Sequence, residues 1–98
     1  MKVFLHPGAE KDIQEAAEFY EREGTPAVAA RFVREFKRLT ALIAEHPDIG
    51  APRTAAGLRS FAMNVFPYSV IYRVGIEGIK VLVVKLDRKR PGYGAARS

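Results

Sequence analysis

The sequence predicts one α+β domain, in which a short N-terminal strand and an antiparallel helical hairpin pack on a three- to four-stranded antiparallel sheet. Three observations indicate this fold class. Two segments between residues 9 and 43 have helical apolar spacing, residues 58–86 have the alternating or continuous apolar pattern of strands, and glycine-bearing turns separate these segments. At 98 residues, the chain is expected to be a single domain spanning 1–98, with a basic C-terminal tail at about 87–98.

The first half of the chain is predicted to form a strand and two helices. Residues 2–5 are a short apolar stretch that suits an edge strand, and Pro7 suits the first turn of a helix. Apolar residues recur at helical spacing over residues 9–20, and again over 28–43 after the N-cap residue Thr25. Because the connection between the two helices is short, we expect an antiparallel hairpin whose apolar stripes face a common partner.

The second half is predicted to form an antiparallel meander. Residues 48–57 have no period and suit a connecting loop, whereas residues 61–65 and 70–74 alternate in polarity. Residues 79–86 are an almost continuous aliphatic run, expected to be a central strand, and the glycines of segment 75–78 suit a hairpin turn. One face of this sheet would cover the helices, and the other would be left partly open as a candidate binding face.

Charge is distributed unevenly along the chain. The net charge is +5, but residues 1–50 carry seven Lys or Arg against nine Asp or Glu, whereas residues 51–98 carry nine against two. The second half therefore has a net charge of +7 and is expected to attract phosphates or an acidic protein partner, more weakly as salt rises. A solvated basic surface without a partner is the alternative.

Several other residues have structural explanations. Tyr68 and Tyr72 are four apart within a strand, so they share one face and are expected to pack in the core. His6 and His46 stand at predicted helix ends, where capping or the helix dipole explains them. The glutamates of the first helix suit a solvated face.

The composition excludes some classes of protein. There is no cysteine, there are two histidines, and no apolar run reaches the roughly 18 residues of a membrane span. We therefore expect no metal, no cofactor and no membrane association. The chain also begins without the apolar region of a signal peptide, so we expect a cytoplasmic protein.

The residues best suited to chemistry form a basic and aromatic cluster in the second half. Its expected members are Arg59, Arg73, Lys85, Arg88, Lys89, Arg90, Tyr93 and Arg97. Neighbouring strands and the tail would bring several of these cations together. Arginine and lysine neutralise phosphate charge and tyrosine stacks on bases, so these types suffice for metal-independent RNA cleavage. Only Asp87 offers a proton acceptor nearby, so a binding surface is the other interpretation.

Three stretches, in this order, resemble the RelE/ParE toxin superfamily. Leu5 to Tyr20 is similar to the first strand and helix of that family. Leu58-Arg59-Ser60 leading to FPYSVIYRV (66–74) is similar to its sheet centre, and VVKLDRKRPGY (83–93) to its last strand and tail. The resemblance spans nearly the whole chain. It implies the toxin of a type II toxin-antitoxin pair, held inactive by an acidic antitoxin encoded beside it.

The resemblance leaves the target open. RelE-like members cut mRNA in the ribosome, and the residues that match their catalytic groups are Arg59, Arg88, Arg90 and Tyr93. ParE-like members instead inhibit DNA gyrase without such cleavage, and here the expected target- or antitoxin-binding residues are Arg73, Lys85, Lys89 and Arg97. The sequence lacks a lysine pair before the central strands and a histidine beside Tyr93, which favours the ParE-like, non-enzymatic branch. A third possibility is a non-toxic module that binds its partner or nucleic acid.

Overall fold

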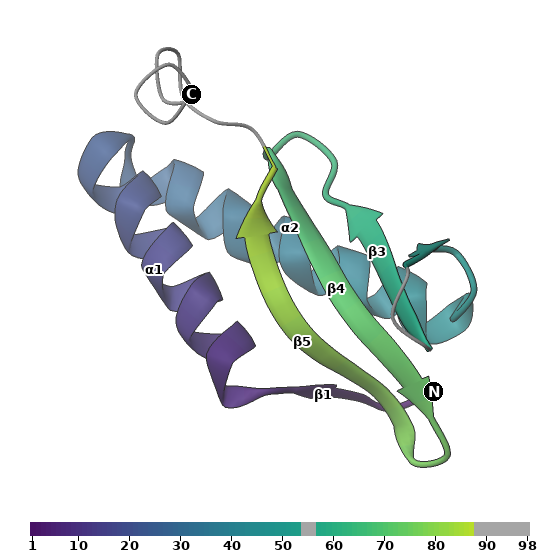
Figure 1. Cartoon of the computed structure of the whole chain (residues 1–98). Coiled ribbons are helices and arrows are strands. Elements are labelled where there is room, and N and C mark those ends of the chain that lie inside the picture. The colour runs from purple at the N-terminus through teal and green to yellow at the C-terminus, as the bar shows by residue number, and fades with distance from the viewer. Residues whose placement is uncertain (54–56, 88–98) are drawn as a thin grey trace, which may run out of the picture.

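The computed structural model describes residues 1–53 and 57–87. The elements, in chain order, are β1 (Val3–Leu5), α1 (Pro7–Glu23), α2 (Pro26–Glu45), β2 (Ala51–Pro52), β3 (Leu58–Ala62), β4 (Tyr68–Gly75) and β5 (Gly78–Leu86). In Figure 1, α2 crosses behind the sheet and α1 lies beside β5, so the front face of the sheet carries no helix. The α+β architecture predicted from the sequence, with one face left open, is confirmed.

Both helices begin at the residues that the sequence indicates. The Nδ1 atom of His6 accepts a hydrogen bond from the Gly8 N–H at 2.9 Å, and Thr25 Oγ1 accepts one from the Val28 N–H at 3.2 Å. Pro7 and Pro26 follow these caps in the first turn, where a missing N–H leaves no hydrogen bond unmade. His6 therefore has the capping role expected for it. Neither helix, and no other helix among the described residues, is long and apolar enough to cross a membrane.

The sheet is larger than predicted and is not wholly antiparallel. Its strand order is β1-β5-β4-β3-β2. β1 runs parallel to β5, with Val3 opposite Ile79, and β2 pairs antiparallel with β3 inside the segment expected to be a loop. β5 is an interior strand, as expected, because it lies between β1 and β4, although β1 pairs with it only as far as Val81. β4 is the middle strand of the five. A two-residue strand ending in Pro52 leaves no periodic signal, and a three-residue strand does not reveal its direction.

The core lies between the helices and the inner face of the sheet. Its largest fully buried side chains come from α2 and from the two longest strands, namely Phe32, Ile43, Val70, Tyr72, Ile79 and Val81. Tyr68 packs beside them, with its ring centroid 5.3 Å from that of Phe32, so both strand tyrosines belong to the core side as expected. Tyr20 of α1 joins this aromatic cluster at 5.0 Å from Phe66. Burial, and secondarily the nearby Tyr68, raises the pKa of Tyr20.

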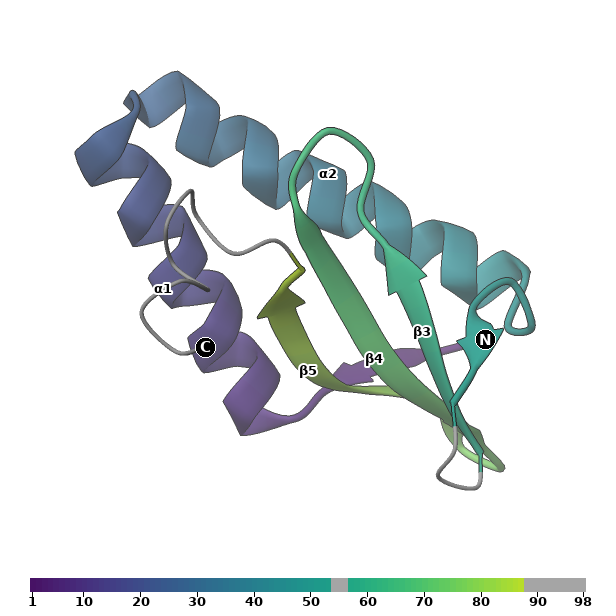
Figure 2. The same cartoon turned by 45° about the horizontal axis from the view of Figure 1, so that its top comes forward.

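The edge of β5 beyond the end of β1 is closed by a side chain. Strand β1 stops at Leu5, and the His6 N–H makes the last contact with the Val81 carbonyl, at 2.9 Å. Further along β5, the Val84 N–H donates to Asp12 Oδ2 of α1 at 3.0 Å. Figure 2 shows α1 alongside this part of β5. Asp12 thus supplies the acceptor that a neighbouring strand would otherwise provide.

Candidate binding face of the sheet

The face of the sheet away from the helices, here called the open face, carries a row of side chains in register. Phe4 is opposite Lys80, Lys80 is opposite Arg73, and Arg73 is opposite Leu58. Directly paired residues on neighbouring strands project to the same side of a sheet, so this row crosses β1, β5, β4 and β3. Arg73, Lys80 and Phe4 are all exposed. The open face therefore presents two adjacent cations between an aromatic and an aliphatic side chain.

A bulge in β5 brings a third cation to the open face. The pairing shifts between Ile71, which is opposite Val83, and Tyr72, which is opposite Val81, so Leu82 is the extra residue. Without this bulge, Lys80 and Lys85 would point to opposite faces, because their positions differ by an odd number. With it, Lys85 lies opposite Ser69 and shares the open face with Lys80.

Arg59 does not belong to this surface, although the sequence suggested that it would converge with Arg73 and Lys85. It lies opposite Tyr72 and therefore projects to the helix side. Its Nη1 donates to the carbonyl oxygens of Gly50 at 2.8 Å and Asp48 at 3.2 Å, and its Nη2 lies 3.5 Å from Asp48 Oδ1. Arg59 and Arg73 are thus on neighbouring strands but on opposite faces. As placed, the guanidinium holds the loop between α2 and β2.

The carboxylate expected near the cluster is engaged at the end of β5. Asp87 Oδ2 accepts a hydrogen bond from the hydroxyl of Ser69 at 2.6 Å, and the Asp87 N–H donates to the Pro67 carbonyl at 2.8 Å. These contacts anchor the residue that follows β5 to the start of β4. The remaining predicted site residues lie outside the described residues, namely Arg88, Lys89, Arg90, Tyr93 and Arg97.

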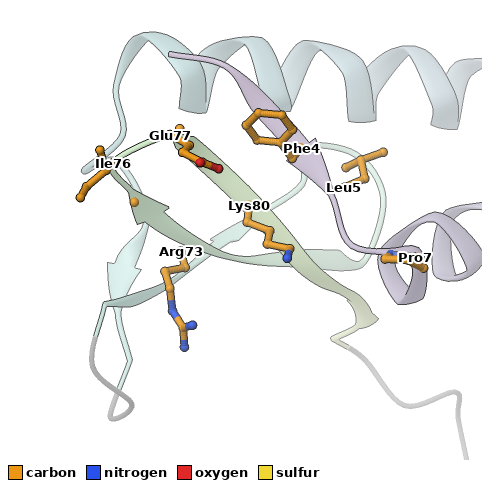
Figure 3. A pocket seen from close by; sticks show the side chains of 9 residues that line it. Phe4, Leu5, Pro7, Arg73, Ile76, Glu77 and Lys80 are labelled. Carbon is orange, nitrogen blue, oxygen red and sulfur yellow. The ribbon is translucent and has the colours of Figure 1, made fainter.

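Sequence reasoning missed Lys80 and Phe4, which complete the site. Together with Arg73, Ile76 and Pro7 they line a shallow cavity of about 760 Å³ beside the β4–β5 hairpin. In Figure 3 the side chains of Arg73 and Lys80 leave neighbouring strands, Arg73 pointing down in this view and Lys80 obliquely down and to the right. The available signal was the polarity of Lys80 inside an otherwise aliphatic strand, which marks an outward-facing position.

The chemistry of this surface is that of anion binding. In the described part of the chain, no ion pair involves Arg73 or Lys80. Nor do residues 1–53 and 57–87 bring together three His, Cys, Asp or Glu side chains that could hold a metal. Two unpaired cations on a rigid sheet attract carboxylates or phosphates.

Comparison with solved structures identifies the fold. The chain is similar to a structure described as the chromosomal ParDE TA system from P. aeruginosa, with a TM-score of 0.80 and 19% identity over 90% of this chain and 97% of that chain. It is also similar to the isolated E. coli RelE toxin, with a TM-score of 0.61 and 17% identity over 97% of this chain and 93% of that one. A search of curated proteins finds no match.

These likenesses, together with the helical hairpin and the open basic face, define a protein of the RelE/ParE fold. The family model described as "ParE toxin of type II toxin-antitoxin system, parDE" matches residues 3–91. The chain belongs to this ParE toxin family. The superfamily predicted from the sequence, and its ParE-like branch, are thereby confirmed.

Proposed function

We propose that this protein inhibits DNA gyrase by binding and not by catalysis, and that an acidic antitoxin encoded by the neighbouring gene neutralises it in the cytoplasm. The observation that carries the proposal is the family match over residues 3–91. The position of Arg59 supports the non-enzymatic branch, since RNA cleavage by this chain would require Arg59 to act beside Arg88, Arg90 and Tyr93.

The hydrogen bonds of Arg59 make that catalytic role costly. Its guanidinium donates to two backbone carbonyls of the 48–50 loop, and a phosphate would have to displace them. Arg73, the cation beside it in the sheet, points to the other face. Arg73 is therefore not available to assist Arg59 at a scissile phosphate.

The surface proposed to bind gyrase or the antitoxin is the basic one. Arg73 and Lys85 lie on the open face, and the structure adds Lys80 to them. We infer that Lys89 and Arg97, which lie outside the described residues, contribute to the same binding. Because exposed charges are screened by salt, complexes formed through these residues should weaken as ionic strength rises.

The proposal is tested by inducing the chain alone in cells and following DNA and protein synthesis by pulse-labelling over minutes. We expect DNA synthesis to stop first, with a DNA-damage response, and purified protein to inhibit gyrase supercoiling. Tyr93→Phe should keep full toxicity, and removal of residues 88–98 should relieve it. Co-expression of the neighbouring antitoxin gene should restore growth.

Two other results would each favour a different function. If protein synthesis stops first, and Tyr93→Phe abolishes both toxicity and mRNA cleavage on ribosomes, the protein is a RelE-like endonuclease. If induction leaves growth unchanged while the antitoxin still binds, the chain is a non-toxic partner-binding member of the family.

A further inference from the structure

We propose that Arg73, Lys80 and Phe4 form one recognition site for a carboxylate that stands beside an apolar side chain in the antitoxin. This inference rests on the proposed neutralisation by an antitoxin, and it specifies the site and the chemistry of the segment bound there. The three residues are called the β1/β4/β5 site below.

The geometry places the two cations side by side. Arg73 and Lys80 are directly opposite in the antiparallel ladder of β4 and β5. Side chains so paired begin about 5 Å apart at their Cβ atoms, so a single carboxylate can contact both charged groups. A guanidinium can hold a carboxylate through two parallel hydrogen bonds while an ammonium approaches from the side.

The electrostatics of the free protein leave this pair uncompensated. Like charges directly opposite on neighbouring strands destabilise a sheet. Glu77 lines the same cavity but forms no ion pair with either cation. Two other carboxylates have partners of their own, since Asp87 accepts from Ser69 and Asp48 lies beside Arg59. Among the described residues, no carboxylate is paired with Arg73 or Lys80, so a partner can supply one.

The apolar side chains around the cations favour a peptide over a nucleic acid. Phe4 is 41% exposed next to Lys80, and Ile76 is fully exposed at the hairpin. Exposure of these two apolar side chains to water is unfavourable in the free protein. An apolar side chain of the partner would remove them from water. The Lys2 ammonium lies 5.7 Å from the centroid of the Phe4 ring and competes with any base for stacking on it.

The test measures the affinity of the full-length protein for the antitoxin encoded beside its gene, by isothermal titration calorimetry at two salt concentrations. We expect Arg73→Glu and Lys80→Glu each to weaken binding roughly 10- to 100-fold. Phe4→Ala should weaken it less, without changing the salt dependence. Arg34→Glu is the matched control because Arg34 is an exposed cation of α2, on the other side of the sheet. It should change the affinity by less than about threefold.

A stability measurement separates recognition from folding. Lys80→Glu places opposite charges across the β4–β5 ladder, so the melting temperature of the free protein should rise while its antitoxin affinity falls. A residue with only a structural role would not show these opposed effects. A carboxylate-to-lysine change in the antitoxin that restores the binding of Lys80→Glu would identify the bound side chain.

The outcomes distinguish this site from the proposed function. If the wild-type protein binds its antitoxin and both charge reversals bind equally well, the site is wrong and neutralisation stands. If the wild type does not bind the antitoxin, both the site and the proposed neutralisation fail, whereas gyrase inhibition is decided by its own test. If Arg73→Glu and Lys80→Glu bind the antitoxin normally but lose binding to a duplex DNA or single-stranded RNA oligonucleotide, the site belongs to nucleic acid and the inference is overturned.

Discussion

The backbone N–H of Gly50 donates a hydrogen bond to the hydroxyl of Tyr72 at 2.9 Å, joining the end of the helical layer to the middle of the sheet. The same hydroxyl donates to the Pro47 carbonyl at 2.7 Å. Gly50 and Tyr72 are both buried. Arg59 contacts the same loop by donating a hydrogen bond to the Gly50 carbonyl. One tyrosine and one arginine thus hold the loop that connects α2 to β2.

We expect Gly50→Ala to lower the free energy of unfolding by about 1–3 kcal/mol, since it forces a methyl group into occupied space. A Cβ atom at this position would lie 2.7 Å from the Tyr72 hydroxyl and 2.8 Å from its Cε1. Urea unfolding measures the effect. Gly75→Ala is the control because a Cβ there meets nothing closer than 3.7 Å. A Gly50→Ala protein as stable as the Gly75→Ala protein would refute the close contact.

The hydroxyl of Tyr72 can be tested on its own. Tyr72→Phe leaves the Gly50 N–H and the Pro47 carbonyl without their partner, so we expect a loss of about 1–3 kcal/mol of stability. In the double variant with Gly50→Ala, the two losses should sum to less than their separate values, because both changes disrupt one contact. Full additivity in urea unfolding would show that the two residues act independently.

The turn between β3 and β4 contains a strained residue. Val65 has a φ of 75° and lies between the Asn64 carbonyl and the Phe66 N–H, which are hydrogen-bonded at 2.9 Å. A β-branched residue is disfavoured there, at a cost on the order of 1–3 kcal/mol. We expect Val65→Gly to stabilise the protein by roughly 1 kcal/mol, after subtracting the extra chain entropy of glycine. Val65→Ala retains a Cβ and should give little gain in a thermal melt, so equal gains for both variants would contradict the strain.

Removal of the Asp12 carboxylate should expose the free edge of β5. We expect Asp12→Ala to lose about 1–2 kcal/mol of stability, because the Val84 N–H then has no acceptor in the described structure. An unpaired strand edge also favours association, so the variant should form dimers at lower protein concentration than the wild type. Urea unfolding and light scattering measure the two effects. Glu15→Ala, an exposed acidic residue of the same helix, should change neither.

The stability of the protein should decline at alkaline pH in part through Tyr20. Its folded-state pKa is raised above the ordinary 10.0, so the unfolded chain releases this proton first as pH rises. The contribution of Tyr20 is therefore complete below pH 10.0 and is lost as pH passes through the raised pKa. Tyr20→Phe has no phenol to titrate. Its free energy of unfolding should therefore fall less than that of the wild type when the pH is raised from 8 to above the raised pKa of Tyr20. Parallel stability curves for the two proteins would contradict this effect.

The helices were predictable almost to the residue, whereas the faces of the strands were not. Thr25 and Pro26 mark the start of α2 by local chemistry that needs no tertiary context. The side of the sheet on which Arg59 lies depends instead on its pairing with Tyr72, and a shift of one residue would reverse it. The apolar patterns of two neighbouring strands do not determine which of their residues are paired.

The grouping of the basic residues depended on a feature with no sequence signal. The bulge at Leu82 places Lys80 and Lys85 on one face, although simple alternation separates them. Without it, Lys85 would project to the face opposite to Lys80 and Arg73. Phe4 was missed for a different reason. Its neighbour Lys80 is 76 positions away, and parallel strands are not joined by a short turn that the sequence would reveal.

The parallel pairing of β1 with β5 also governs how the protein is made. Val3 finds its partner only when Ile79 is available, and Asp12 reaches Val84 across 72 residues. Such distant contacts form slowly, and no growing chain can form them before residues 79–84 leave the ribosome. The sheet, with the row from Phe4 to Leu58, therefore cannot form while only the helical hairpin has been made. The open face is thus a late product of translation, although its first strand is among the earliest residues made.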